Sequence, residues 1–226
     1  MSNANSFVPA LGWRSLTPLY DPIVRIVTRE ATWRSAFLAQ ISPRSDEVIL
    51  DVGCGTGSLA ILLKQSAPGA HIVGLDPDTD ILERAAAKAK QAGVEIEWRQ
   101  GFARDAGQNP GAFDKTVSSL VFHQVPVAEK QAGIDAMIAG TKPSGEVHIA
   151  DFAAQRSRFM RAAFGVVGRV DGSVNTQPNA DGAIERILSG VSPEASIPTA
   201  IFRTPLGEIS LFRLIRTGRS DTQNAA

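Results

Sequence analysis

The chain is poor in the residues on which several classes of protein depend. Cys54 is the only cysteine among 226 residues, so no disulfide forms within the chain, which suits a reducing compartment. Basic and acidic residues both number 23, so the bulk charge gives no support for a nucleic-acid partner. No stretch approaches the roughly 20 apolar residues of a membrane span, and residues 1–10 lack the basic start and apolar centre of a signal peptide. We therefore expect a cytoplasmic protein without a transmembrane segment, for which transient contact with a membrane surface stays open.

Residues that bind metals or act as nucleophiles are equally sparse. The chain has 3 histidines, and no histidine–cysteine pair has the spacing of metal ligands. No serine or cysteine has a convincing base beside it for nucleophilic catalysis. The sequence therefore predicts neither a metal site nor nucleophilic catalysis.

Strand-like and helix-like segments alternate along the chain. Apolar strand candidates lie at 48–52, 71–75, 94–99, 114–120, 146–151, 198–204 and 208–216. Helix candidates lie at 57–66, 79–91, 128–140, 155–168 and 181–189, with stops at 68–69, 93 and 142–145. This order predicts an α/β fold with one doubly wound, mostly parallel, seven-stranded sheet. The last two strands flank Pro205-Leu206-Gly207, which predicts a hairpin that adds one antiparallel strand at the edge.

The length fits a single domain with a sizeable core. Residues 1–15 are polar and interrupted by proline and glycine, which is typical of a loose arm. Residues 16–40 become helical after Pro22, residues 41–216 form the core, and residues 217–226 form a disordered tail. No repeat, low-complexity tract or second domain is evident, so residues 1–226 are expected to form one domain.

The most informative segment is Asp51–Gly57, which reads DVGCGTG between an apolar strand and an apolar helix face. Gly53 and Gly55 permit positive φ angles and let a ligand approach the backbone closely. Gly57 falls where the helix must pack closely on its strand. The third glycine of a dinucleotide-binding GxGxxG turn is absent, and an acidic residue before the glycines fits a pyrophosphate badly. The segment fits a ligand that carries a positive charge, such as S-adenosyl-L-methionine.

VILDVGCGTG resembles motif I of class I S-adenosylmethionine-dependent methyltransferases, and the resemblance extends from about Leu16 to Arg216. The chain is most similar to the ubiquinone/menaquinone-biosynthesis-type enzymes of that family. The resemblance implies a Rossmann-like fold, S-adenosyl-L-methionine as cofactor and S-adenosyl-L-homocysteine as product.

The resemblance also assigns roles to residues that follow the predicted strands. Asp76 is expected to accept hydrogen bonds from the ribose hydroxyls, and Pro77 and Asp78 to line the adenosine rim. The alternative for Asp76 is an N-cap of the helix near Thr79, a role for which Asp78 competes. The backbones of Ser119 and Leu120 are expected to meet the cofactor ammonium. The full expected cofactor set is Tyr20, Asp51, Gly53, Cys54, Gly55, Thr56, Gly57, Asp76, Pro77, Gly101, Phe102, Ala103, Ser119 and Leu120.

Gly101-Phe102-Ala103 departs from the family pattern, because Phe102 stands where related enzymes have an aspartate that binds the adenine amino group. Three interpretations stay open. The Phe102 ring stacks on or packs against the purine, Asp105 reaches the amino group from the next turn, or Phe102 belongs to the core.

His123 and Tyr20 are the candidate catalytic residues. His123 follows the strand at 114–120, where a neutral imidazole can take a proton from a phenol or enol; the alternative is a structural histidine bonded to a loop carbonyl. Tyr20, the only tyrosine, precedes a helix that resembles the lid of similar enzymes. Arg25 and Arg29 on that helix either meet the cofactor carboxylate or form its polar face.

The expected function is methyl transfer to a small, hydrophobic acceptor of quinone, phenol or lipid type, with C- or O-methylation favoured. The apolar region 152–200, including Phe159, Met160, Phe164, Val166 and Val167, is expected to cover the acceptor or to form the buried face of a helix. Two other functions stay open: a non-catalytic S-adenosylmethionine-binding module and an NAD-dependent oxidoreductase. Asp51 and the missing third glycine argue against the latter.

Overall fold

The computed structural model describes residues 30–217. The chain divides into two compact units that interleave along the sequence. The first, unit 1, comprises Met1–Gln40, Leu120–Lys130 and Ala150–Leu211. The second, unit 2, comprises Ile41–Ser119, Gln131–Ile149 and Phe212–Ala226. The loose arm, most of the predicted lid helix and nearly all of the tail lie outside the described residues, and the single domain stays a prediction.

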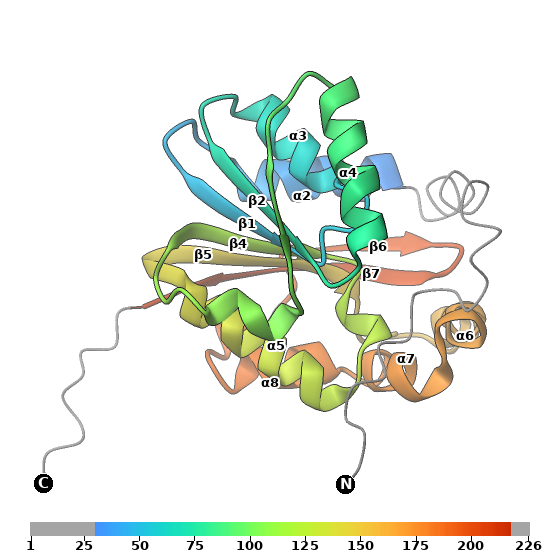
Figure 1. Ribbon diagram of the computed structural model, residues 1–226. Coiled ribbons are helices and arrows are strands. Elements are labelled where there is room, and N and C mark those ends of the chain that lie inside the picture. Colours follow the sequence, from blue (N-terminus) through green and yellow to red (C-terminus); the bar gives the residue numbers. More distant parts are fainter. Residues whose placement is uncertain (1–29, 218–226) are drawn as a thin grey trace, which may run out of the picture. The chain divides into compact units, whose positions relative to one another are not determined.

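Helices and strands alternate as the sequence predicts (Figure 1). The α-helices are α2 (Glu30–Ile41), α3 (Ser58–Ser66), α4 (Thr79–Gln91), α5 (Val127–Gly140), α6 (Arg158–Asp171), α7 (Ser173–Ala180) and α8 (Ala183–Ser189). Three short 3-10 helices are η1 (Ala103–Gly107), η2 (Phe122–Gln124) and η3 (Glu194–Ser196). The strands are β1 (Val48–Val52), β2 (His71–Asp76), β3 (Glu97–Gln100), β4 (Phe113–Ser119), β5 (Thr141–Phe152), β6 (Ala200–Thr204) and β7 (Gly207–Ile215).

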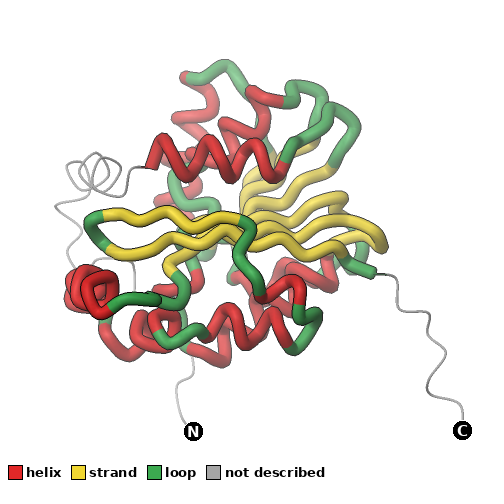
Figure 2. The backbone as a smooth tube through the Cα atoms, turned by 180° about the vertical axis from the view of Figure 1, so that it is seen from behind, coloured by secondary structure: helices red, strands yellow, loops and turns green. Residues whose placement is uncertain are grey.

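The strands form one seven-stranded sheet in the order β3-β2-β1-β4-β5-β7-β6 (Figures 1 and 2). β1 pairs in parallel with both β2 and β4, and β2 pairs in parallel with β3. β6 and β7 pair antiparallel through the predicted hairpin. The order confirms the doubly wound, mostly parallel sheet and adds a detail that the sequence does not give: β6 is the edge strand, and β7 lies between β5 and β6.

Two predicted strand boundaries are wrong, each because of a specific hydrogen bond. β3 begins at Glu97 rather than 94, because the Val94 N–H donates to the Ala89 carbonyl at 3.1 Å and so closes helix α4. β5 begins at Thr141 rather than 146, so it runs through the predicted stop at 142–145. There the Ser144 N–H donates to the Arg216 carbonyl at 2.7 Å and the Arg216 N–H donates to the Gly145 carbonyl at 2.9 Å, so the segment pairs with Arg216 although Ser144 itself is left-handed, with a φ of 65°.

Helix α7 is absent from the sequence prediction, because its segment SVNTQPNA is polar and contains Pro178. Local propensity does not favour a helix there. The Thr176 hydroxyl donates to the Gly172 carbonyl at 3.1 Å, and two asparagines bind backbone groups elsewhere in unit 1. Tertiary hydrogen bonds therefore stabilise a helix that its sequence alone does not predict.

In unit 2, apolar helix faces cover a strongly apolar parallel sheet. β1 is buried from Ile49 to Val52, and α4 buries Leu82, Ala85 and Ala89 at helical spacing. In Figure 1, α3 and α4 lie on one face of β1, β2 and β4, and α5 lies on the other. No helix of residues 30–217 has the length and apolar character needed to cross a bilayer.

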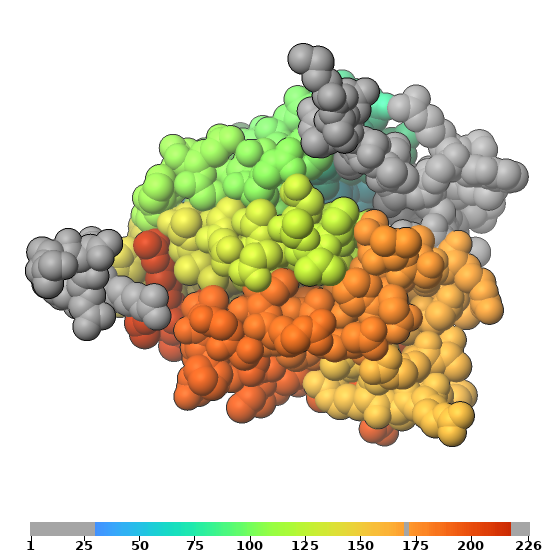
Figure 3. Space-filling view, turned by 90° about the horizontal axis from the view of Figure 1, so that it is seen from below, coloured from blue at the N-terminus to red at the C-terminus, as the bar shows by residue number. Residues whose placement is uncertain are grey.

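Unit 1 contains β6, the part of β7 up to Leu211 with the hairpin turn, and the helices α6, α7 and α8, whose residues adjoin one another in Figure 3. α6 begins after the N-cap Ser157, whose hydroxyl accepts from the Met160 N–H at 3.1 Å. Gly207, at a φ of 127°, starts β7 so close to α6 that an added Cβ would lie 3.1 Å from the Phe164 Cβ. The close approach of this hairpin therefore requires glycine.

Gly74→Ala tests the packing of unit 2. An added Cβ would lie 2.5 Å from the Trp98 ring and 3.0 Å from the Cys54 Sγ. We expect a loss of about 1–3 kcal/mol in the free energy of unfolding, since a packed core tolerates extra volume poorly. Gly165→Ala in α6 is the control: nothing lies within 4 Å of its added Cβ, so a gain of roughly 0.5–1 kcal/mol is expected. Urea denaturation measures both, and a stability gain for Gly74→Ala would contradict the packing.

Candidate functional site

The glycine turn between β1 and α3 has the backbone that its sequence predicts. Gly53, Gly55 and Gly57 have φ angles of 67°, 52° and 73°. The N–H groups of Gly53 and Cys54 both donate to the Leu75 carbonyl, at 2.8 and 3.0 Å. The turn is therefore fixed to the carboxyl end of β2, on the edge of the sheet where ligands of such folds bind.

The glycines of this turn serve two different purposes. An added Cβ at Gly55 would meet nothing within 4 Å, so there is open space next to the backbone. An added Cβ at Gly57 would lie 2.6 Å from the Trp98 ring and 3.2 Å from the Cβ of Ala85. Close packing at Gly57 is thus against β3 and α4, not against the preceding strand. Gly55 leaves room for a ligand, and Gly57 lets the helix start close to the core.

Asp76 at the end of β2 binds the glycine turn directly. Its Oδ2 accepts from the Gly55 N–H at 2.9 Å and its Oδ1 accepts from the Asp78 N–H at 3.1 Å. The N-cap of α4 is Asp78, whose Oδ1 accepts from the N–H groups of Asp80 and Ile81 at 2.9 and 3.3 Å. The capping interpretation of Asp76 is therefore wrong, and its carboxylate is half-buried beside the open space at Gly55.

Two carboxylates make the surroundings of the turn negative. Asp51 is fully buried on β1. Burial raises the pKa of the Cys54 thiol, and the charges of Asp51 and Asp76 raise it further. Burial also raises the pKa of Asp76, an effect that the N–H groups of Asp78 and Gly55 oppose. A phosphate would meet repulsion here, whereas a cationic ligand would be attracted.

The segment Gly101–Ala103 lies next to Asp76, because the Gly101 N–H donates to the Asp76 carbonyl at 3.1 Å. The Asp105 Oδ2 accepts from the Phe102 N–H at 2.8 Å, and this bond caps η1. The Arg104 guanidinium lies 4.4 Å from the centroid of the half-buried Phe102 ring. The carboxylate of Asp105 is thus engaged in a cap, and the role of Phe102 towards a purine stays a prediction.

The switch point of the sheet lies between β1 and β4 in unit 2. Val52 is in register with Ser118, whose hydroxyl donates to the Val52 carbonyl at 3.0 Å. Ser119 therefore ends β4 next to the start of the glycine turn. The chain then continues into unit 1 at Leu120, which has a φ of 57° and donates its N–H to the Ala150 carbonyl at 2.8 Å.

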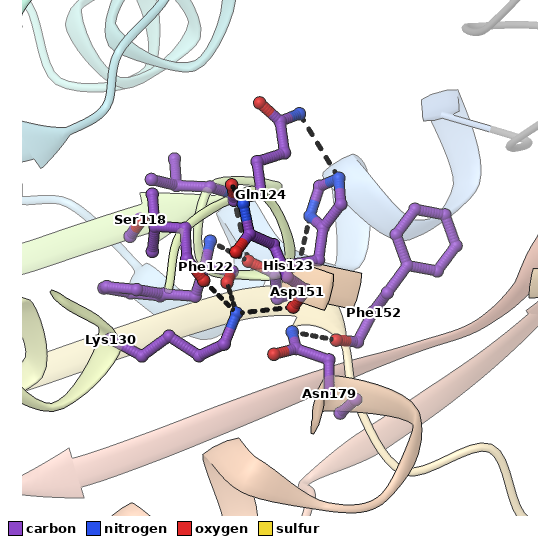
Figure 4. A network of polar contacts seen from close by, with 12 residues as sticks. Ser118, Phe122, His123, Gln124, Lys130, Asp151, Phe152 and Asn179 are labelled. Atoms are coloured by element: carbon purple, nitrogen blue, oxygen red, sulfur yellow. Dashed lines mark hydrogen bonds and ion pairs between the residues drawn. The ribbon is translucent and has the colours of Figure 1, made fainter. Parts of the chain in front are cut away.

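His123 forms a buried pair with Asp151 at the end of β5 (Figure 4). The imidazole Nδ1 lies 2.7 Å from the Asp151 Oδ1, and the side chains are 3% and 1% exposed. The Asp151 Oδ2 accepts from the N–H groups of Val121 and Phe122 at 3.0 and 2.6 Å. The partner of the imidazole Nδ1 is therefore a carboxylate, and the choice between a base and a structural histidine stays a prediction. Asp151 went unnoticed in the sequence, although an aspartate after Val-His-Ile-Ala in an apolar strand is unusual enough to mark it.

The carbonyl groups of the histidine turn, Val121–Val125, also accept hydrogen bonds (Figure 4). Lys130 of α5 is 0% exposed, and its Nζ donates to the carbonyls of Phe122, Val125 (2.6 Å) and Asn175 (3.0 Å). Burial lowers the pKa of Lys130 to about 8, against the opposing charge of Asp151. Nothing in the sequence around Lys130 distinguishes it from a surface lysine in the first turn of a helix.

Helix α7 completes this cluster with two asparagine amides. The Asn175 Nδ2 donates to the Gln124 carbonyl at 2.9 Å, and the Asn179 Nδ2 donates to the Phe152 carbonyl at 2.6 Å. The imidazole of His123 lies edge-on to the Phe152 ring, with centroids 5.3 Å apart. The Gln124 amide nitrogen lies 3.3 Å from the His123 Nε2. Both N–H groups and carbonyl groups of the turn are thus hydrogen-bonded, and Asp151 and Phe152 orient the imidazole.

The structure separates the predicted site residues into two groups. The glycine turn, Asp76, Pro77, Gly101–Ala103 and Ser119 belong to unit 2, while Leu120 and His123 belong to unit 1. Tyr20, Arg25 and Arg29 lie outside the described residues. Their roles, like those of the cofactor set, stay predictions. Among residues 30–217 no group of three or more His, Cys, Asp or Glu side chains is placed to hold a metal ion.

The apolar residues predicted to cover an acceptor do not share one face of α6. Met160, Phe164 and Val167 are buried, whereas Phe159 is 74% and Val166 is 45% exposed. The interpretation as one continuous buried helix face is therefore wrong for Phe159 and Val166.

Comparison with known proteins identifies the family to which the chain is similar. Residues 49–145 match the family described as "Methyltransferase domain". The demethylmenaquinone methyltransferase of Thermus thermophilus is 30% identical over 157 residues, which cover 69% of this chain and 69% of that protein. The ubiquinone biosynthesis O-methyltransferase of Vibrio atlanticus is 30% identical over 175 residues, 77% of this chain and 69% of that one. The solved magnesium protoporphyrin IX methyltransferase of Synechocystis, with bound S-adenosylhomocysteine, has a TM-score of 0.61 at 19% identity and covers 94% and 90% of the two chains. That last likeness shows the fold alone.

Asp76→Ala tests the predicted ribose contact. We expect the affinity for S-adenosylhomocysteine to fall by about 1.5–3 kcal/mol, the range for hydrogen bonds to a charged group. Asp80→Ala is the matched control, because Asp80 is an exposed carboxylate in the first turn of α4 and should cost less than about 1 kcal/mol of stability with little change in affinity. Calorimetric titration and thermal unfolding separate the two effects. Equal affinity for wild type and a folded Asp76→Ala variant would leave Asp76 only its role in the turn.

Lys130→Met tests the bonds to the histidine turn. The change leaves three carbonyls, one buried and two part-buried, without this donor, so we expect a loss of about 1–3 kcal/mol at pH 7. The folded-state pKa of Lys130 is about 8 against an ordinary value of 10.5, so between these values the unfolded chain binds more protons. Wild-type stability should therefore rise relative to the variant as the pH increases through this window.

Urea denaturation at several pH values measures that difference. The exposed Lys90→Met is the control and should change stability by less than about 0.5 kcal/mol at any pH. A difference between wild type and Lys130→Met that shrinks as the pH rises would have the wrong sign for a buried, destabilised ammonium.

Proposed function

Because the chain belongs to the class I S-adenosylmethionine-dependent methyltransferases of the ubiquinone/menaquinone-biosynthesis type, we propose that it methylates a small, hydrophobic acceptor of quinone or phenol type. The similar proteins of Thermus and Vibrio are named for demethylmenaquinone and for ubiquinone biosynthesis, which supports this acceptor class. The observation that supports removal of a proton from such an acceptor is the buried His123–Asp151 pair, in which Nδ1 and Oδ1 are 2.7 Å apart.

The glycine turn suits S-adenosylmethionine better than a dinucleotide. The cofactor bears an ammonium and a sulfonium and no phosphate, and the turn has the charges of Asp51 and Asp76 beside it. Gly55 offers space for a close approach. Asp76 would hold the ribose, Gly53–Gly57 and Ser119 would hold the methionine portion, and Gly101–Ala103 would border the adenine. When bound, the cofactor supplies an activated methyl group.

The chain itself has to orient the acceptor and, for a hydroxyl or ring-carbon acceptor, remove a proton. With Nδ1–H donated to Asp151, the His123 Nε2 is the basic nitrogen of a neutral imidazole. Asp151 holds that tautomer and favours the imidazolium that forms on proton uptake. The 3.3 Å contact with the Gln124 amide nitrogen fits Nε2 as an acceptor.

Orientation is expected to supply most of the acceleration. Holding two reactants in line contributes on the order of 7–11 kcal/mol in favourable cases, and a positioned base adds roughly 10²–10⁴-fold in rate. The rigid histidine turn suits the second contribution, because Asp151 and Lys130 fix its N–H and carbonyl groups. Either C- or O-methylation is compatible with a base at this position.

Two measurements test the function itself. Calorimetric titration should show binding of S-adenosylhomocysteine and none of NADH, because the turn repels phosphates. Mass spectrometry of the purified protein, incubated with labelled cofactor and any copurified acceptor, should show methyl transfer to a phenol- or quinone-like molecule. Binding of NADH alone would overturn the proposal.

His123→Ala tests the base. The single-turnover rate should fall by roughly 10²–10⁴-fold, with little change in affinity for S-adenosylhomocysteine. The wild-type rate should also fall at acid pH, because a protonated imidazole cannot accept a proton. His71→Ala is the control, since His71 is exposed and pairs with Glu97. A wild-type rate and pH profile in His123→Ala would leave orientation as the whole mechanism.

A further inference from the structure

A cavity of about 430 Å³ opens in unit 1 between helix α2, the segment before α6, and the hairpin of β6 and β7. Its walls are Thr32, Arg156, Ile201, Phe202, Arg203 and Glu208. This volume is within the range of pockets that hold small molecules, roughly 300–1,000 Å³. None of these residues is among the expected catalytic or cofactor-binding residues, although Arg156 lies in the region 152–200 that is expected to cover the acceptor.

Two arginines share one buried carboxylate in this cavity. Glu208 is 1% exposed, and its Oε1 lies 3.2 Å from the Arg203 Nε. Its Oε2 lies 3.5 Å from the Arg156 Nη1 and also accepts from the Arg156 N–H at 3.3 Å. Because both guanidinium groups contact the same carboxylate, they lie close enough together to hold one further anion.

Arg203 is the less compensated of the two arginines. Arg156 is paired with two carboxylates: Glu208 of the lining and Glu185, whose Oε1 lies 3.8 Å from the Arg156 Nη2 and also accepts from the Ala154 N–H at 3.0 Å. The Arg156 Nη1 also donates to the Ala154 carbonyl at 3.3 Å. The side chain of Arg203 is 79% exposed, and it pairs with Glu208 through Nε. Its terminal amino groups have donors of the geometry that carboxylates and phosphates accept.

Apart from Thr32, the rest of the wall is apolar. Ile201 is 43% exposed, and Phe202 follows it on the same strand. The frame behind the arginines is rigid, because the buried Gln155 side chain accepts from the Glu208 N–H at 2.7 Å and donates to the Glu208 carbonyl at 3.0 Å. A ligand for this cavity therefore has an oxyanion for the arginines and an apolar body for the wall.

We propose that this cavity binds a small organic anion, an oxyanion carried on an aromatic or alicyclic body, through Arg156 and Arg203. The proposal does not depend on the methyl-transfer chemistry, so it is tested by binding alone. Benzoate and phenyl phosphate are the probes, and benzamide is the uncharged isostere of benzoate.

Titration of the full chain, followed by amide chemical shifts in NMR, tests the site. Benzoate or phenyl phosphate should shift the amides of residues 156, 201–203 and 208 with a dissociation constant of about 1 mM or tighter, as fits a ligand of this size. The stronger of the two identifies carboxylate or phosphate as the preferred group. Benzamide should bind at least about tenfold more weakly. Equal shifts with benzamide, or shifts elsewhere on the chain, would overturn the proposal.

Two variants are expected to change the affinity in opposite directions, and a third is the control. Arg203→Gln, at an exposed position that should not affect folding, should weaken the preferred probe by about tenfold. Glu208→Gln removes the competing carboxylate and should tighten binding several-fold, which a loss of structure would not do. Arg213→Gln is the control, because Arg213 pairs with Glu146 outside the cavity. Weaker binding in Glu208→Gln with an intact spectrum would refute the charge argument, whatever the outcome for the methyltransferase.

Discussion

The histidine turn depends on the burial of one carboxylate. Asp151 is almost completely buried at the end of β5, where an ionised group without hydrogen bonds would be very costly. Two backbone N–H groups and the imidazole of His123 satisfy it. To reach Asp151, the chain must turn sharply after β4, which places Leu120 in a left-handed conformation with a φ of 57°. The shape of the turn, the orientation of the imidazole and its tautomer thus follow from one electrostatic requirement.

The sequence predicts well those features of the fold that depend on residues close together in the chain. The turn Asp51–Gly57 can be predicted from the sequence because its glycines adopt a conformation that other residues avoid, and all three observed φ angles are positive. The alternation of elements follows from apolar periodicity, which fixes β1, β2 and α4 to within a residue. The position of Asp76 follows from those boundaries, because a residue at the end of a parallel strand faces the ligand edge of the sheet.

What the sequence does not show are interactions between distant segments. Lys130 is separated by 45 residues from Asn175, one of the groups it binds, and Asp151 by 28 from His123. Helix α7 forms from a polar, proline-containing segment because its asparagines bind carbonyls elsewhere in the unit. The same limit explains the error at the start of β5, since the Ser144 N–H binds the carbonyl of Arg216, 72 positions away. Local patterns predict most of the elements, whereas tertiary partners account for helix α7 and for the start of β5.

The surroundings of Cys54 also have a consequence for redox chemistry. The only thiol of the chain is 8% exposed, and burial together with the charges of Asp51 and Asp76 keeps it protonated. Oxidants, glutathione and electrophiles react with thiolates rather than thiols. The cysteine of the glycine turn is therefore unreactive as a nucleophile. The negative charges that suit a cationic ligand also suppress ionisation of its thiol. Oxidative stress that inactivates enzymes with exposed thiolates would leave this turn intact.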